Sequence, residues 1–159
     1  MKKINNTIFG LAILMFGLVA AGMIFLPVLI YNDTNSSFTG VQAVFGTEFA
    51  SLGILGSGQI EMNVLGIIAF ALPLVAGIIA VFVNNYKGAI VSIALFAAGA
   101  ILLFLLPSFA TTTITVLGET SAVDVSWTMG NGLIIAACAS IIGAVLSLVK
   151  LLLPNAKTN

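Results

Sequence analysis

The chain has 159 residues, of which 60% are hydrophobic and only 6% are charged. Soluble domains carry about 25% charged residues, so this composition excludes a soluble protein and predicts an integral membrane protein. The formal net charge is zero and the sequence has no basic stripe, so we expect no nucleic-acid partner.

Histidine is absent and Cys138 is the single cysteine. Neither a disulfide framework nor a Cys/His metal cluster can therefore be built within one chain, and we expect no metal and no cofactor. The basic residues are all lysines, which is usual in products of AT-rich bacterial genomes, so a bacterial source is expected.

The charges are segregated along the chain. Lysines flank or link the apolar runs on one side, and carboxylates occupy the loops between them on the other. Because cytoplasmic segments retain lysine and arginine, this predicts a four-span protein of the plasma membrane with both ends in the cytoplasm and two loops outside. The lysines are Lys2, Lys3, Lys87, Lys150 and Lys157, and the carboxylates are Asp33, Glu48, Glu61, Glu119 and Asp124.

The first apolar run covers residues 8–31 and is long enough, at about 1.5 Å per helical residue, to cross a hydrocarbon core of about 30 Å. A secretory signal peptide is the alternative, with Lys2 and Lys3 as its basic region and cleavage near Ala21. The run continues to Tyr31, well past that site, so we favour a retained span.

The first outer loop covers residues 32–63. Residues 38–45 are rich in β-branched and aromatic side chains and predict a strand. Around residues 46–59, Phe45, Phe49 and Leu52 fit one face of a helix, whereas several glycines favour irregular chain. The apolar content indicates that the segment lies on the bundle, which we favour, on lipid headgroups or on a partner.

Three further spans are predicted, at residues 64–83, 89–106 and 133–153. A tight turn at residues 84–88 makes the second and third neighbours, and Pro107 and Pro154 are expected to end the third and fourth. Together they predict an all-α membrane protein: one domain over residues 1–159, folded as an up-down-up-down four-helix bundle.

The second outer loop covers residues 107–132. Polar and apolar residues alternate over residues 111–117 and again over 122–127, with a turn at 118–121, which predicts a β-hairpin. An isolated hairpin is marginal in water, so we expect it to pair with residues 38–45 in a small extracellular sheet.

Small residues mark one face of the fourth span, where close packing of helices is expected. This seam serves packing within the bundle or, alternatively, contact between copies of the chain. Its residues are Gly132, Ala136, Ala139, Ser140, Gly143 and Ser147. Pro73 lies within the second span and predicts a kink, with a gating hinge as the less favoured reading.

The interior of the predicted bundle carries no ionisable group of the kind that proton-coupled transporters and ion relays need. Small four-helix drug exporters resemble the chain in length and span count, but the first run here lacks their glutamate. Cys138 and Ser140 have no base in helical reach, so we expect no enzymatic activity.

In layout, the chain resembles the claudin-like tetraspan class: a longer first outer loop with strand character, a short inner turn and a second outer hairpin. The resemblance implies an outer sheet on a four-helix bundle that mediates side-by-side and cell-to-cell contacts. Residues 40–59 contain neither the tryptophan nor the cysteine pair of the class signature.

The sequence therefore predicts a non-enzymatic membrane scaffold or accessory subunit that contacts lipid and either a membrane or envelope protein or further copies of itself. An oligomeric channel or small transporter is the alternative, and an immunity-type or toxin-type membrane protein is a third. The predicted contact residues are Phe45, Glu48, Phe49, Glu119, Asp124 and Trp127.

Overall fold

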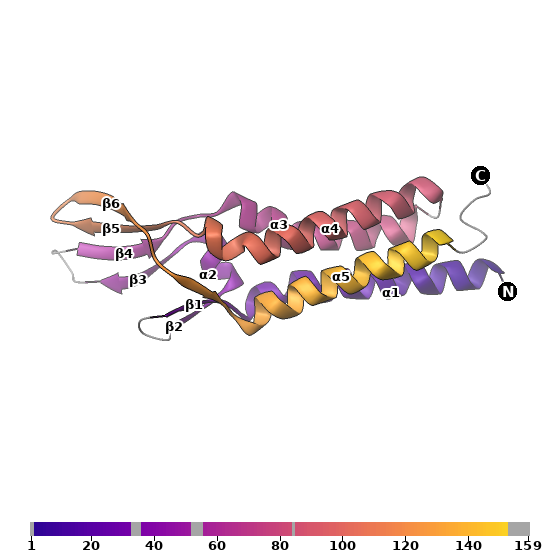
Figure 1. Cartoon of the computed structure of the whole chain (residues 1–159), viewed down its shortest axis with the longest axis horizontal. Helices are drawn as coiled ribbons and strands as arrows, with labels where there is room; N and C mark the ends of the chain where they lie inside the picture. The colour runs from indigo at the N-terminus through magenta and orange to yellow at the C-terminus, as the bar shows by residue number, and fades with distance from the viewer. Residues whose placement is uncertain (1, 33–35, 52–55, 84, 153–159) are drawn as a thin grey trace.

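The computed structural model describes residues 2–32, 36–51, 56–83 and 85–152 and is mainly helical. Strands and short helices gather at one end of an elongated bundle, which we name the sheet end (Figure 1). At the opposite end, the turn end, α1 begins, α3 leads into α4 and α5 ends. The long helices are α1 (Lys2–Gly22), α3 (Val64–Phe82), α4 (Tyr86–Phe109) and α5 (Asn131–Leu152).

The four long helices confirm the prediction of four apolar segments. α1 packs on α3 and α5, and α4 packs on the same two helices, so the bundle closes on itself. Large apolar side chains such as Leu11 and Val145 remain exposed around it, as side chains facing lipid would be. The segments long and apolar enough to cross a membrane are Thr7–Phe25, Val64–Phe82, Tyr86–Phe109 and Asn131–Leu152.

The first apolar run is only partly helical. The sequence predicts a span over residues 8–31, but α1 ends at Gly22 and a 3₁₀ turn, η1 (Met23–Phe25), follows. Strand β1 (Pro27–Tyr31) comes next. The residue before a proline avoids the helical region, and Leu26 is accordingly extended, with φ −97° and ψ 164°. The prediction of a helix as far as Tyr31 is therefore wrong.

The third span is longer than predicted at both ends. α4 begins at Tyr86 because the Asn85 side chain accepts a hydrogen bond from the Gly88 amide at 2.8 Å, which caps the first turn. It also continues through Pro107 to Phe109. A proline in the last turn removes one backbone hydrogen bond, which does not end the helix at once. The bounds of α3 and α5 lie within two residues of the prediction.

The small-residue face of α5 is buried along its length. A Cβ atom at Gly143 would lie 2.5 Å from the ring of Phe96 on α4, and one at Gly132 would lie 2.8 Å from the carbonyl oxygen of Pro27. Only glycine permits these approaches, so the face sets how closely α5 packs within this one chain. The buried residues include Gly132, Ala136, Ala139, Ser140, Gly143 and Ser147.

Pro73 lies buried between two glycines at the centre of the bundle. A Cβ atom at Gly99 of α4 would lie 2.9 Å from the Pro73 ring, and one at Gly17 of α1 would lie 2.5 Å from the Pro73 carbonyl oxygen. α3 remains helical through this position. Three helices thus meet at one residue, which is a packing role for the proline.

Two small antiparallel sheets form the sheet end. The three-stranded sheet has the order β2 (Ser36–Thr39), β1, β7 (Trp127–Met129). The four-stranded sheet has the order β3 (Thr47–Ser51), β4 (Gly56–Ile60), β5 (Thr112–Val116), β6 (Glu119–Val123). Both sheets combine strands from the two predicted outer loops. They share a hydrophobic core with the bundle that includes Val28, Leu29, Phe38, Val44, Ile60, Phe70, Leu103, Leu106 and Leu133.

The predicted hairpin is confirmed as β5 and β6, although its turn is the pair Leu117 and Gly118 rather than residues 118–121. Its second strand ends at Val123, and Trp127 belongs to β7 in the other sheet, where it pairs with Tyr31. Strand β5 of the hairpin pairs with β4, although the glycines of that segment predict irregular chain.

The predicted strand over residues 38–45 is wrong because its larger part is the helix α2 (Gly40–Phe45). Thr39 and Gln42 form a capping box in which the Thr39 hydroxyl accepts from the Gln42 amide, and the Gln42 side chain accepts from the Thr39 amide. These local hydrogen bonds begin a helix where β-branched composition favours a strand. Gly40 then packs on Ile24, whose backbone would lie 2.7 Å from a Cβ atom.

The glycines that favoured irregular chain are what lets β4 join the sheet. A Cβ atom at Gly56 would lie 2.4 Å from the Thr115 carbonyl oxygen, and one at Gly58 would lie 2.9 Å from the ring of Phe49. Glycine in a strand marks a close approach of another group, which here is the hairpin backbone on one side and an aromatic ring on the other.

Replacing Gly143 with leucine should destabilise the bundle by about 1 to 3 kcal/mol, because the new side chain overlaps the Phe96 ring. Thermal unfolding in detergent, followed by far-UV circular dichroism, measures the effect. Val145→Leu is the matched control, since Val145 lies on the exposed side of the same helix. Equal melting temperatures for the two variants would contradict the proposed packing.

Candidate interaction surface

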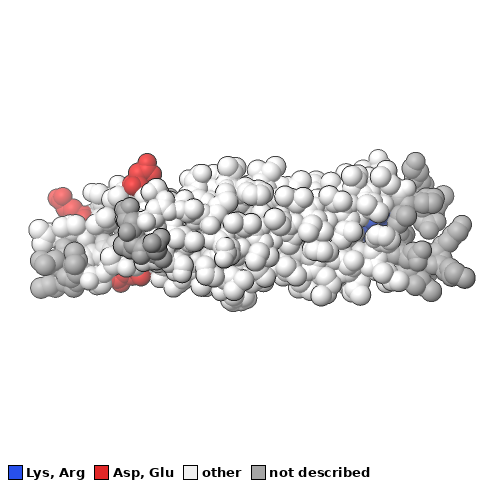
Figure 2. All heavy atoms as spheres, turned by 60° about the horizontal axis from the view of Figure 1, so that its bottom comes forward, with Lys and Arg blue, Asp and Glu red and all other residues white. Residues whose placement is uncertain are grey.

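Acidic side chains lie at the sheet end, and the described lysine side chains lie at the turn end (Figure 2). Glu48, Glu61, Glu119 and Asp124 are exposed, as is Lys87 beside the α3–α4 turn. Asp33 and Lys157 lie outside the described residues, as do the side chains of Lys2 and Lys3. The charges that are described therefore leave the sheet end acidic, with no lysine near it to compensate them.

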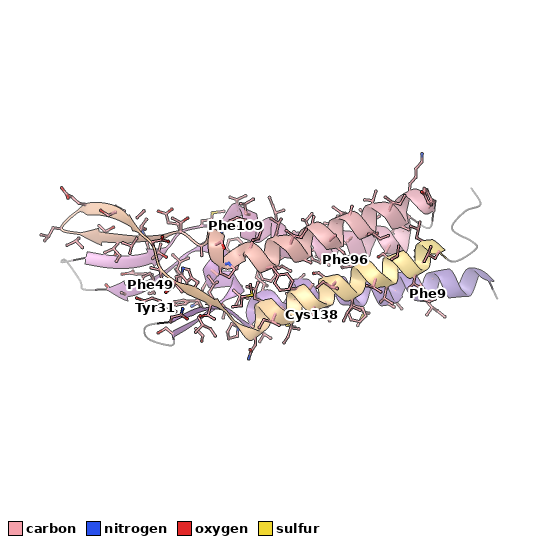
Figure 3. The ribbon with its side chains drawn as sticks, viewed as in Figure 1. Phe9, Tyr31, Phe49, Phe96, Phe109 and Cys138 are labelled. Carbon is pink, nitrogen blue, oxygen red and sulfur yellow. The ribbon has the colours of Figure 1, made fainter. Side chains whose placement is uncertain are left out.

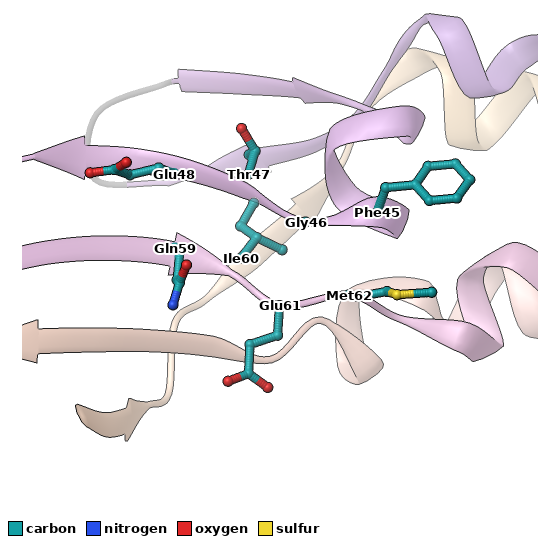
Figure 4. Close-up of a pocket in the computed structure, with 8 residues that line it drawn as sticks. All are labelled: Phe45, Gly46, Thr47, Glu48, Gln59, Ile60, Glu61 and Met62. Carbon is teal, nitrogen blue, oxygen red and sulfur yellow. The ribbon is translucent and has the colours of Figure 1, made fainter.

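A groove of about 510 Å³ lies where α2 leads into β3 and β4 leads toward α3 (Figure 4). Gly46 makes the turn between α2 and β3 with φ +88°, a conformation that favours glycine. The groove is lined by Phe45, Gly46, Thr47, Glu48, Gln59, Ile60, Glu61 and Met62.

The two ends of this groove differ in chemistry. Phe45 and Met62 extend toward the helices, and both are more than half exposed. Glu48 points away from the helices, and Glu61 projects from the chain directly after β4 (Figure 4). The groove thus changes from apolar near the bundle to acidic near the sheets.

Four aromatic rings join the two sheets at their base. Trp127 contacts Tyr31 and Phe38, with ring centroids 5.8 and 5.6 Å apart, and Phe49 contacts the same two rings at 6.4 and 6.1 Å. Figure 3 shows Tyr31, on β1 of one sheet, close to Phe49, on β3 of the other. The rings are tilted or edge-on, which are the favourable arrangements. This cluster fixes the position of one sheet against the other.

Besides the groove and the aromatic cluster, the sheet end carries the β5–β6 hairpin, whose strand β6 is the edge of the four-stranded sheet. One face of the hairpin carries a hollow of about 500 Å³. Its walls are mainly apolar, with one carboxylate and one hydroxyl. The lining residues are Ile114, Val116, Leu117, Glu119, Ser121 and Val123.

The six predicted contact residues fall in three places. Phe45 and Glu48 line the groove. Phe49 and Trp127 belong to the aromatic cluster. At the hairpin, Glu119 lines the hollow and Asp124 is exposed directly after β6. The aromatic pair is turned inward and serves the fold. The other residues are accessible to a partner.

Sequence reasoning missed Lys150, which is 4% exposed at the turn end of α5. Its ammonium donates a hydrogen bond to the Ala80 carbonyl on α3. The sequence contains a pattern that indicates this burial. Lys150 follows Gly143 and Ser147 at helical spacing and so lies on the same face of α5 as the buried small residues. A lysine at that position can bury its stem and bind a helix-end carbonyl.

Met62, Val116 and Leu117 were also missed. Each is more than half exposed, and each lines the groove or the hollow. An exposed apolar residue has no distinctive pattern in a loop sequence, so only the folded surface identifies these three.

The described side chains bring together no catalytic pair. Cys138 is exposed on α5, and the Ser140 hydroxyl donates to the Ala136 carbonyl at 2.9 Å (Figure 3). Across the described residues, no three of the histidine, cysteine, aspartate and glutamate side chains are grouped so that they could hold a metal ion. Comparison of the chain with protein-family models, curated proteins and solved structures gives no match.

Trp127→Ala should destabilise the sheet end by about 3 kcal/mol, because it removes the ring that contacts both Tyr31 and Phe38. Proteolysis at the sheet end under native conditions measures the loss. Leu117→Ala is the control, since Leu117 is 78% exposed at the hairpin turn and should change stability by less than about 0.5 kcal/mol. Equal cleavage rates would mean that the cluster does not hold the sheets together.

Lys150→Ala should destabilise the turn end by about 2 kcal/mol, because the buried Ala80 carbonyl loses a charged donor and the lysine stem leaves a gap. Thermal unfolding in detergent is the measurement. Lys87→Ala, at an exposed lysine on the same end, should have almost no effect. The expectation fails if the two alanine variants unfold at the same temperature.

Proposed function

We propose that this protein is a non-enzymatic membrane scaffold or accessory subunit of the plasma membrane, and that its sheet end contacts another membrane or envelope protein. The single observation that carries the proposal is the acidic, structured sheet end, which projects beyond the helices that would lie in lipid. Small exposed sheets with uncompensated charge suit recognition of a partner.

The proposed orientation places the sheet end outside and the turn end in the cytoplasm, with the helices crossing up-down-up-down and both termini inside. Lys87 and Lys150 support it, because lysines concentrate on the cytoplasmic side. Phe45 and Met62 then lie where the outer leaflet begins, and their exposed side chains would contact lipid.

The interior supports a scaffold better than a channel formed by one chain. Phe96 is fully buried against Gly143, and Pro73 is enclosed between Gly17 and Gly99. These contacts fill two adjacent turns in the interior of the bundle. A channel would therefore need a pore between copies of the chain. In the proposed role, the chain is similar to the claudin-like class only in its layout, and its sheets make the contacts with the partner.

The proposal predicts that a foreign protein accompanies the tagged chain, at a fixed stoichiometry, when it is isolated from its native membrane in mild detergent. Neutralising the sheet end by Glu48→Gln, Glu61→Gln, Glu119→Gln and Asp124→Asn together should lower the recovered partner about tenfold, because complementary charge is removed. Lys87→Gln, at the turn end, is the control and should leave the recovery unchanged. Native mass measurement gives the stoichiometry.

Recovery of the chain without any partner would refute the proposal. Recovery of a homo-oligomer alone would favour the channel alternative, and ion or substrate flux into liposomes that contain only this protein would establish it.

A further inference from the structure

We propose that the free edge of β6 receives an extended segment of the partner protein as an additional strand, and that this segment carries apolar side chains on one face and a basic residue beside Glu119. The inference rests on the proposed function, since it names the part of the sheet end that the partner occupies. It is carried by three features of the hairpin: an open edge, a hollow beside that edge, and a strained apolar residue at the turn.

Among the described residues, β6 is an edge strand that pairs with no strand other than β5. It borders the four-stranded sheet, and its residues from Glu119 to Ala122 are exposed. Soluble proteins usually blunt such edges with lysine, proline, a bulge or a covering segment. β6 contains no lysine or proline, and its pairing with β5 is regular throughout. At the opposite edge of the sheet, by contrast, β3 has an irregularity between Glu48 and Ala50.

The hairpin geometry shows which backbone groups of β6 are open. In a hairpin closed by a two-residue turn, the pair next to the turn exchanges its backbone hydrogen bonds, and hydrogen-bonded and non-hydrogen-bonded pairs then alternate. Val116 and Glu119 flank the turn here. The amides and carbonyls of Thr120 and Ala122 therefore point outward, toward the position of an added strand.

The side chains agree with this assignment. The hydroxyl oxygens of Thr115 and Thr120 lie 3.0 Å apart across the two strands. Side chains of a non-hydrogen-bonded pair are the closer ones in an antiparallel ladder, so Thr120 directs its backbone away from β5.

The hollow beside the edge gives an added strand something to contact. Glu119, Ser121 and Val123 share one face of β6 and form its near wall, with Ile114 and Val116 of β5 beyond them. A strand laid along β6 would project every second side chain over this face. Backbone hydrogen bonds would then supply affinity, and the hollow would select apolar side chains.

Leu117 is an apolar residue in an unfavourable conformation. It has φ +53° and is 78% exposed at the first position of the turn, where asparagine or aspartate is ordinarily preferred. Residues held in such sparsely populated conformations cluster at functional sites, which makes Leu117 a candidate contact. In the proposed complex Leu117 covers one end of the added strand.

The carboxylates beside β6 determine which charge the added strand should carry. Glu119 lines the hollow and Asp124 follows β6, and neither has a described lysine nearby. A basic side chain on the added strand would compensate them. A second copy of β6 would instead bring the same two carboxylates to the same edge, which disfavours self-pairing.

The test uses a variant that removes one open amide and keeps the hairpin. Ala122→Pro deletes the outward N–H, and proline is tolerated on an edge strand whose N–H faces solvent. Ala122→Val is the matched control, because it keeps the N–H and favours a strand. Circular dichroism and the fluorescence of Trp127, the single tryptophan, verify that both variants are folded.

The probe is a phage-displayed library of random peptides of about ten residues, selected on the purified full-length protein in detergent. Wild type and Ala122→Val should enrich peptides that alternate apolar residues and carry lysine or arginine. Ala122→Pro should bind these peptides about tenfold more weakly. Leu117→Asn should also weaken binding while it raises or preserves the melting temperature, which separates contact from folding.

The inference is overturned if no peptide is enriched, if the enriched peptides are acidic or lack alternation, or if folded Ala122→Pro binds them as wild type does. A dimer of the pure protein that Ala122→Pro abolishes would also overturn it, in favour of a second copy. These outcomes are separate from the proposed function. A partner recovered from native membrane with Ala122→Pro as efficiently as with wild type leaves the scaffold role standing and removes only the edge of β6 from it.

Discussion

Close approach of helix backbones at glycine is the constraint on which the remaining structure depends. In the proposed membrane location the surrounding lipid is as apolar as leucine, so burial of apolar surface would not by itself hold the helices together, and packing contacts would do so. The contacts of Pro73 with Gly17 and Gly99, and of Phe96 with Gly143, join all four long helices. Larger side chains at these glycines would separate the helices.

The segments that leave the helix ends form the sheets. Each sheet takes strands from both of the segments that leave the bundle, so neither segment could form its sheet alone. Asn63 connects two helices at the end of the bundle from which the sheets project. Its side chain caps α3 by accepting from the Gly66 amide and donates to the Phe109 carbonyl at the end of α4, at 3.1 and 3.0 Å. One side chain thus begins one helix and ties it to the end of its neighbour.

The sheet end divides its residues between structure and recognition. The aromatic rings of the cluster are turned inward, where they hold the two sheets together, while carboxylates and a few apolar side chains remain accessible. A rigid base under an open strand edge would lower the entropic cost of binding, because the edge is already in the conformation that a partner strand requires. The proposed scaffold role and the proposed strand addition both draw on this division.

The sequence by itself determined the four apolar helices, the segregation of charge, the small face of α5 and the β5–β6 hairpin. Each of these follows from composition or from a period of 3.6 or two residues, which is local information. The proline at position 27 and the capping box of Thr39 and Gln42 are local signals as well, and they end α1 and begin α2. Only the tertiary structure decided that β1 pairs with β7 and that β4 pairs with the hairpin. It also turned Phe49 and Trp127 inward and left the edge of β6 open. These outcomes depend on which distant segments meet, and no local pattern carries that information.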